Sequence, residues 1–134
     1  MQQPVSLEAA CQALPELWSP RIVAEVNGQF LKVVRVQGEF PWHSHSAEDE
    51  LFLVLRGELR IGRDSADGGD VFLGPGEFFV VPKGVRHCTS AVNETWMALF
   101  EPVSTAHTGD QITPLTRTLA EQLAPLSPKP LTQP

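Results

Sequence analysis

The stretch PWHSHSAEDELFLVLRG, residues 41–57, joins a histidine pair and an acidic run to an apolar run that ends at a glycine. His43 and His45 are separated by one residue, so in a strand both imidazoles point to the same face. Glu50 opens the apolar run and can add a carboxylate oxygen from an adjacent strand. Two histidines and a carboxylate suit a first-row transition metal with open coordination positions. The stretch therefore predicts a metal site.

A second cluster, GEFFVVPKGVRH at residues 76–87, adds His87 as a further ligand candidate. Three of the four histidines of the chain lie in these two clusters. The fourth, His107, follows the last predicted strand and is expected on the surface. A lone histidine is a weak signal, but a pair one residue apart with a glutamate and a third histidine favours a ligand set.

Strand parity selects among the three consecutive acids of the first cluster. Asp49 has the opposite strand parity to Glu50, and Glu48 lies further from the apolar run, so Glu50 is the preferred carboxylate. Phe52 and Val54 share the parity of Glu50. These two residues are therefore the predicted apolar side chains on the face of the metal, and they are the expected lining of a pocket.

Length, charge and composition limit the classes of function. The chain of 134 residues is long enough for one domain with a core and short for two. Its net charge of −6 argues against nucleic acid or an anionic membrane as the main partner. No apolar run approaches the roughly 20 residues that span a bilayer, and the first residues lack the pattern of a secretory signal. A cytoplasmic protein is expected.

The region after residue 20 reads as short strands. RIVAEV (21–26) and QFLKVVRVQ (29–37) flank Asn27-Gly28, the strongest short hairpin signal. Gly38 is expected to end the second strand, and Gly57 is expected to turn a second hairpin between LFLVL and ELRIGR. The pattern predicts about eight to ten strands, without helices between them, in an antiparallel sandwich or barrel. Further predicted strands are VFL (71–73), EFFVV (77–81), VRHCTSAV (85–92) and TWMALFE (95–101).

Two helices are expected outside the strands. SLEAACQAL, residues 6–14, has Ser6 as N-cap and an apolar face with helical spacing. TRTLAEQLA, residues 116–124, predicts a brief helix, and the proline-rich residues 125–134 are expected to be flexible. The cysteines, Cys11 and Cys88, are too few for a disulfide framework, and Cys88 is expected to be a packed free thiol.

The first cluster resembles the first motif of the cupin superfamily, which is a glycine, His-x-His, a glutamate and a second glycine at set spacings. Here the motif reads Gly38, His43-Ser44-His45, Glu50 and Gly57, with the first spacer one residue shorter than usual. The later spacings fit the motif. The resemblance covers about residues 21 to 102.

The second cluster resembles the second cupin motif. Gly76, Pro82-Lys83-Gly84 and His87 match it, whereas Ala91 replaces the usual final asparagine. The loop between the two motifs is short, as in compact single-domain bacterial cupins. Both motifs in the right order are a specific signal.

The resemblance implies an all-β jelly-roll barrel, also called a double-stranded β-helix. The sequence pattern adds a short N-terminal helix and a flexible proline-rich C-terminal tail. The implied divisions are an N-terminal extension (1–20), the barrel (21–102) and a partly disordered C-terminal extension (103–134). The implied ligands of one divalent metal ion (iron, manganese, nickel, zinc or copper) are His43, His45, Glu50 and His87. Small cupins are commonly homodimers, and we expect a homodimer here.

The sequence leaves two classes of function open. One is a metal-dependent enzyme, dioxygenase-like or isomerase-like, that acts on a small polar organic substrate. The other is a non-catalytic module that binds or senses a small ligand, in which the metal holds the ligand or stabilises the fold. Acid–base groups near the metal would favour the enzyme, and a purely apolar cavity would favour binding.

Overall fold

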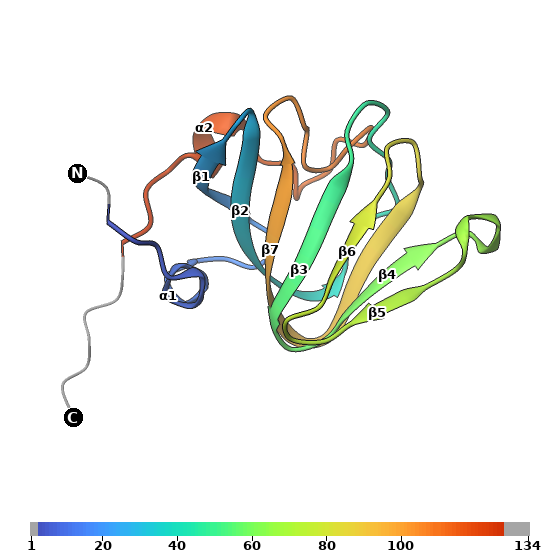
Figure 1. The fold of residues 1–134 in the computed structure, drawn as a ribbon, viewed down its shortest axis with the longest axis horizontal. Coiled ribbons are helices and arrows are strands. Elements are labelled where there is room, and N and C mark those ends of the chain that lie inside the picture. Colours follow the sequence, from blue (N-terminus) through green and yellow to red (C-terminus); the bar gives the residue numbers. More distant parts are fainter. Residues whose placement is uncertain (1–2, 128–134) are drawn as a thin grey trace.

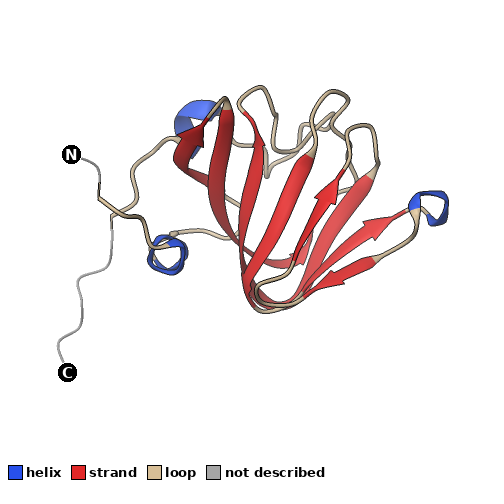
Figure 2. Cartoon of the chain, viewed as in Figure 1, coloured by secondary structure: helices blue, strands red, loops and turns tan. Residues whose placement is uncertain are grey.

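The computed structural model describes residues 3–127, and these residues form a curved antiparallel sheet, with one short helix before it and one after it in the chain (Figures 1 and 2). Within the described residues the sheet has seven strands. The strands are β1 (Arg21–Val26), β2 (Gln29–Glu39), β3 (Glu50–Arg56), β4 (Leu59–Arg63), β5 (Val71–Leu73), β6 (Phe78–Val81) and β7 (His87–Pro102). The helices are α1 (Leu7–Gln12), the 3-10 turn η1 (Ser65–Asp67) and α2 (Leu119–Gln122).

Strand β7 connects the two parts of the sheet. Its C-terminal half, Thr95 to Pro102, lies between β2 and β3, whereas its N-terminal residues pair with β4 and with the end of β2. The sheet therefore curves around one main core, to which β2, β3, β4 and β7 all contribute buried apolar side chains. The predicted all-β barrel architecture is confirmed.

The β1–β2 hairpin forms as the sequence predicts. Asn27 and Gly28 have φ angles of 50° and 78°, the positive values that a two-residue type I′ connection requires. The register pairs Val26 with Gln29 across the turn. Local turn chemistry is therefore sufficient to position this edge of the sheet.

The predicted break at Gly38 is wrong. β2 continues to Glu39, and Gly38 (φ 86°) lies in a register shift between β2 and β7. A glycine with positive φ is compatible with a bulge as well as with a strand end. The bulge carries the chain onward to the histidine pair.

The predicted hairpin at Gly57 is also wrong. β3 pairs with β6 and β7, whereas β4 pairs with β5 and β7, so the two strands on either side of Gly57 do not pair with each other. A Cβ atom at Gly57 would lie 2.5 Å from Thr95 Oγ1. The glycine therefore lets the chain pass closely over β7 between two parts of the sheet.

The predicted strands at 85–92 and 95–101 form a single strand, β7. Asn93 and Glu94 have the composition of a turn, but both remain extended where β7 exchanges partners. This merger explains why the described residues contain fewer strands than the sequence predicts.

Helix α1 packs on the outer face of the sheet. Ser6 is its N-cap and accepts a hydrogen bond from the Ala9 amide, as predicted. Cys11 is fully buried and packs in a small cluster with Val33 and Trp96. Cys11 and Cys88 are both buried free thiols, so the prediction for Cys88 is confirmed.

After β7, residues 103–118 form a segment that we call the C-terminal strap, drawn in orange in Figure 1. The strap leads to α2, which is shorter than predicted and begins at the N-cap Thr118 with a capping box to Glu121. Residues 128–134 of the tail that the sequence predicts to be flexible lie outside the described residues. Within residues 3–127, no helix has the length and hydropathy needed to cross a membrane.

Candidate metal centre

The fold brings together the four residues of the predicted ligand set. His43, His45, Glu50 and His87 each offer a donor atom, and these atoms lie within 4.8 Å of one another. Glu50 is the first residue of β3 and His87 is the first residue of β7. The main chains of His43 and His87 exchange two hydrogen bonds of 2.9 Å, which join the two sequence clusters. All four side chains are buried.

Backbone carbonyl groups fix the orientation of two imidazoles. His43 Nδ1 lies 2.8 Å from the Pro41 carbonyl oxygen, and His87 Nδ1 lies 3.0 Å from that of Val85. A hydrogen bond from Nδ1–H to a carbonyl leaves Nε2 with a free lone pair, which is the usual arrangement of metal-binding histidines. Both rings are therefore set to present Nε2 to a metal ion.

Two buried Nε2 atoms of the cluster lack a hydrogen-bond partner among the described residues. Nε2 of His45 and Nε2 of His87 are buried and have no hydrogen-bond partner there. They lie 3.7 and 3.6 Å from the two carboxyl oxygens of Glu50. Buried polar atoms without a partner are costly, and a shared cation would satisfy all three groups. The residues thus fit a divalent transition-metal ion.

Burial keeps the imidazoles neutral. It lowers the pKa of His43 to about 3, with a further contribution from the charge of His87. Burial also lowers the pKa of His45 and of His87. Neutral imidazole is the form that binds a metal. Burial raises the pKa of Glu50, whereas a bound cation would lower it. Binding of the ion and ionisation of Glu50 therefore favour each other.

A buried polar network lies behind Glu50. Burial, followed by the charge of the nearby Glu50 carboxyl, raises the pKa of Glu101 well above its ordinary value. Lys32 Nζ lies 2.6 Å from Glu101 Oε1 and donates to Gln122 Oε1 of α2, also at 2.6 Å. The network therefore links a predicted ligand to the C-terminal helix.

A narrow cavity adjoins the cluster. Only about 30 Å³ of it is open to the centre of a water molecule, which is room for one or two water-sized groups. Most of its lining is apolar, and its polar lining side chains are His43, Glu50, Thr89 and His107. The apolar and aromatic lining consists of Trp18, Pro20, Val34, Phe40, Phe52, Met97 and Leu99.

The comparisons with known proteins agree with this geometry. The family model of the cupin domain matches residues 30–101, which is more than half of the chain. The chain belongs to the cupin family.

Three similar proteins support that assignment, and the names of these three give no reaction. The uncharacterized protein YdbB of Bacillus subtilis (strain 168) is 37% identical over 73 residues, which are 54% of this chain and 63% of that protein. This cupin therefore spans less than two thirds of that relative. A cupin-2 domain containing protein from Shewanella frigidimarina NCIMB 400 is 37% identical with a TM-score of 0.69, covering 73% of this chain and 93% of that one. Protein NMB1881 from Neisseria meningitidis is 29% identical with a TM-score of 0.67, covering 75% and 99%.

Other sequence predictions about the site have mixed outcomes. Asp49 is exposed and accepts a hydrogen bond from the Lys83 amide, so it lies outside the cluster as expected. Phe52 lines the cavity beside Glu50. Val54 is fully buried in the main core but does not line the cavity.

The prediction that His107 lies on the surface is wrong. Its side chain is 8% exposed and lines the same cavity as His43 and Glu50. Burial lowers the pKa of His107 to about 4. In the sequence, His107 is a lone histidine in a polar segment after the barrel, and no fixed spacing connects it to a motif. The charged and titratable groups that act on its pKa are Lys32, Glu101, Arg117 and His45.

Sequence reasoning also missed the buried network. Lys32 and Glu101 lie in strands where a charged residue is usually solvated, yet they are 1% and 0% exposed. The available signal was parity: Lys32 shares the face of Val34 and Val36, both of which are buried core residues. An apolar face that carries one lysine requires a buried partner of opposite charge.

Proposed function

We propose that this cupin binds one divalent transition-metal ion through His43, His45, Glu50 and His87. The observation that carries the proposal is the pair of buried Nε2 atoms, on His45 and His87, that have no partner in the described chain and lie beside the Glu50 carboxyl. Imidazole donors suit iron, manganese, nickel, zinc or copper, whereas calcium and magnesium prefer an all-oxygen set.

The proposed activity is that of a metal-dependent enzyme on a small organic molecule with an oxygen donor. When bound, the ion would supply Lewis-acid polarisation or, if it is redox-active, a site for dioxygen. The side chains of this chain hold the substrate in a mostly apolar cavity beside the ligand cluster. Thr89 and His107 also line the cavity and are not ligands of the ion. These additional hydrogen-bonding groups favour an enzyme over a binding module with a purely apolar cavity.

The second candidate is a non-catalytic binding or sensing module. The observation that favours it is the small free volume of the cavity, about 30 Å³, which leaves little space for a substrate together with a co-substrate. The two candidates share the ligand set. They differ in whether the metal-loaded protein converts any oxygen-bearing molecule that it binds.

Calorimetric titration of the metal-free protein tests the shared part of the proposal. Zinc, manganese, nickel and iron(II) are added to the wild type, to His45→Ala and to the control Asp49→Asn, which alters an acid outside the cluster. We expect about one ion per chain for the wild type and the control, and a large loss of affinity for His45→Ala. Equal binding by all three proteins would overturn the ligand assignment.

Turnover then separates the candidates. The metal-loaded protein is incubated aerobically with small hydroxylated and oxo compounds, and product formation and oxygen consumption are followed. Catalysis that is lost in His45→Ala supports the enzyme. Ligand binding without conversion of any bound compound supports the binding module.

A further inference from the structure

The C-terminal strap places the imidazole of His107 in the cavity that His43 also lines. His107 lies outside the residues that match the cupin model. The family model ends at residue 101, and the strap begins at residue 103. His107 on this strap lines the cavity with His43 and Glu50, and its ring centroid is 6.4 Å from that of Phe40. The strap therefore lies outside the residues that match the family model.

The hydrogen bonds of His107 fix which ring nitrogen carries the proton. The Arg117 amide donates to His107 Nε2 at 2.6 Å. Nε2 is therefore an acceptor, and the proton of the neutral ring lies on Nδ1. Among residues 3–127 no group accepts a hydrogen bond from this Nδ1–H. Nδ1–H is thus the ring donor that His107 retains for a ligand in the cavity it lines.

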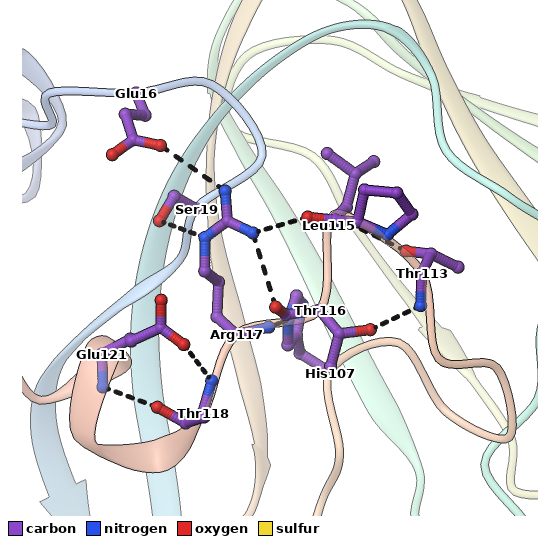
Figure 3. A network of polar contacts seen from close by, with 10 residues as sticks. Glu16, Ser19, His107, Thr113, Leu115, Thr116, Arg117, Thr118 and Glu121 are labelled. Carbon is purple, nitrogen blue, oxygen red and sulfur yellow. Dashed lines mark hydrogen bonds and ion pairs between the residues drawn. The ribbon is translucent and has the colours of Figure 1, made fainter.

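A polar network holds Arg117, and with it His107, in place (Figure 3). The Arg117 guanidinium donates to Ser19 Oγ at 3.2 Å and to the Pro114 carbonyl at 3.0 Å, and it pairs with Glu16 at 3.5 Å. These contacts join the strap to the segment that precedes β1. The orientation of the His107 ring is therefore set by the folded chain before any ligand arrives.

The strap is also attached directly to the histidine pair. Ser44, between His43 and His45, donates its amide to Asp110 Oδ1 at 3.0 Å and accepts a 3.1 Å hydrogen bond from the Asp110 amide. A Cβ atom at Gly109 would lie 2.3 Å from the Ser44 carbonyl oxygen. The absence of a side chain at Gly109 thus permits this close approach.

A strained residue that also lines the cavity, Trp18, supports a role in ligand binding. Trp18 has a φ angle of 60°, which is unfavourable for a bulky side chain. Its amide and indole N–H groups donate to the carbonyls of Arg35 and Gln37, and its ring stacks on Phe40 at 5.1 Å. Strain of this kind costs about 1–3 kcal/mol and is concentrated at functional sites.

We propose that His107 is a ligand-binding residue that donates its Nδ1–H to an oxygen atom of a small, mostly apolar molecule held at the metal. The inference rests on the proposed metal site. The aromatic and aliphatic lining selects an apolar body, and among the described residues no lysine or arginine lines the cavity. The ligand class is therefore a small, mostly apolar hydroxy or oxo compound.

Binding of acetohydroxamate, a small molecule with two oxygen donors and a methyl group, tests the inference. The cobalt(II)-loaded protein is titrated with acetohydroxamate, and the visible absorption of the metal reports binding. The variants are His107→Phe, which keeps a ring without a donor, and His107→Gln, which restores an N–H donor. Ile112→Ala is the control, because Ile112 lies on the strap and is 94% exposed.

We expect His107→Phe to bind acetohydroxamate about tenfold more weakly, the loss of one hydrogen bond. His107→Gln should stay within about threefold of the wild type, and Ile112→Ala should be unchanged. All variants should contain the same amount of metal. Wild-type affinity in His107→Phe, equal weakening in His107→Phe and His107→Gln, or failure of the wild type to bind the probe would overturn the inference.

Two further measurements distinguish a failure of the proposed function from a failure of the inference. A wild type that takes up no metal overturns the proposed function, whereas full metal content with an affinity indifferent to residue 107 overturns only the inference. If His107→Phe does not fold, nitrogen-15 NMR of the zinc-loaded wild type gives the answer directly. The Nδ1–H proton resonance of His107 should move downfield on addition of acetohydroxamate, and an unmoved resonance would overturn the assignment.

Discussion

Replacement of Lys32 by methionine should destabilise the metal-free protein by about 3 kcal/mol. The side chains of Lys32 and Glu101 are 2% and 0% exposed, and the N–O distance between them is 2.6 Å. Removal of one partner from a buried ion pair costs about 3–5 kcal/mol, because the other charge is left uncompensated. Burial and Glu50 already raise the pKa of Glu101, so this carboxyl can take up a proton when the ammonium is lost. The expected loss is therefore at the lower end of the range.

Urea unfolding of four proteins measures the interaction as a double-mutant cycle. These proteins are the wild type, Lys32→Met, Glu101→Gln and the double variant. Because each single variant leaves a buried group unpaired, the double variant should lose less free energy of unfolding than the sum of the singles, by about 2 kcal/mol. A loss below about 1 kcal/mol in Lys32→Met, or strict additivity in the double variant, would refute the reasoning.

Three further predictions follow from single contacts. Gly109→Ala should lower the free energy of unfolding by about 1–3 kcal/mol and make the strap more sensitive to limited proteolysis, because its Cβ would meet the Ser44 carbonyl oxygen; unchanged proteolysis would contradict this. His107 has its pKa lowered from 6.5 to about 4, so the unfolded chain binds more protons between these values and stability falls as the pH drops from 6.5 to 4. His107→Gln should remove up to about 3 kcal/mol of that loss in the metal-free protein, and parallel pH curves would exclude the effect. Ser6→Ala should cost about 1 kcal/mol in thermal unfolding through loss of the α1 N-cap, and an unchanged transition would show that the cap is dispensable.

The ligand cluster could be predicted because its signals are local. The spacing of His43 and His45 fixes a common face in an extended segment, and the parity of Glu50 separates it from Asp49. The cupin motifs supplied the remote member, His87. The Asn27-Gly28 turn was predictable for a similar reason, since two adjacent residues carry the required conformation.

The rest of the cavity could not be predicted because it depends on contacts between distant segments. Trp18 precedes the barrel and His107 follows it, and neither has a fixed spacing to a ligand. Their positions depend on Arg117, which joins the strap to Ser19 across 98 residues of sequence. Composition alone makes the strap look like a flexible extension.

Strand partners were similarly beyond the sequence pattern. Gly57 lies between two strands at hairpin spacing, but the tertiary fold sends β3 to β6 and β4 to β5. Alternation defines which face of a strand is buried, and it does not define which strand lies beside it. The Lys32–Glu101 ion pair was also beyond the sequence pattern, because it joins two strands that no sequence spacing connects.

Elemental analysis of tag-free protein tests the central claim most directly. The wild type is compared with His45→Ala and with the matched control His107→Gln. His107 is a buried histidine that lines the cavity and is outside the ligand set. We expect nearly one equivalent of a first-row transition metal in the wild type and in His107→Gln, and little in His45→Ala. A wild type that contains no such metal and takes up none when iron(II), manganese, nickel, zinc or copper is added would contradict the claim.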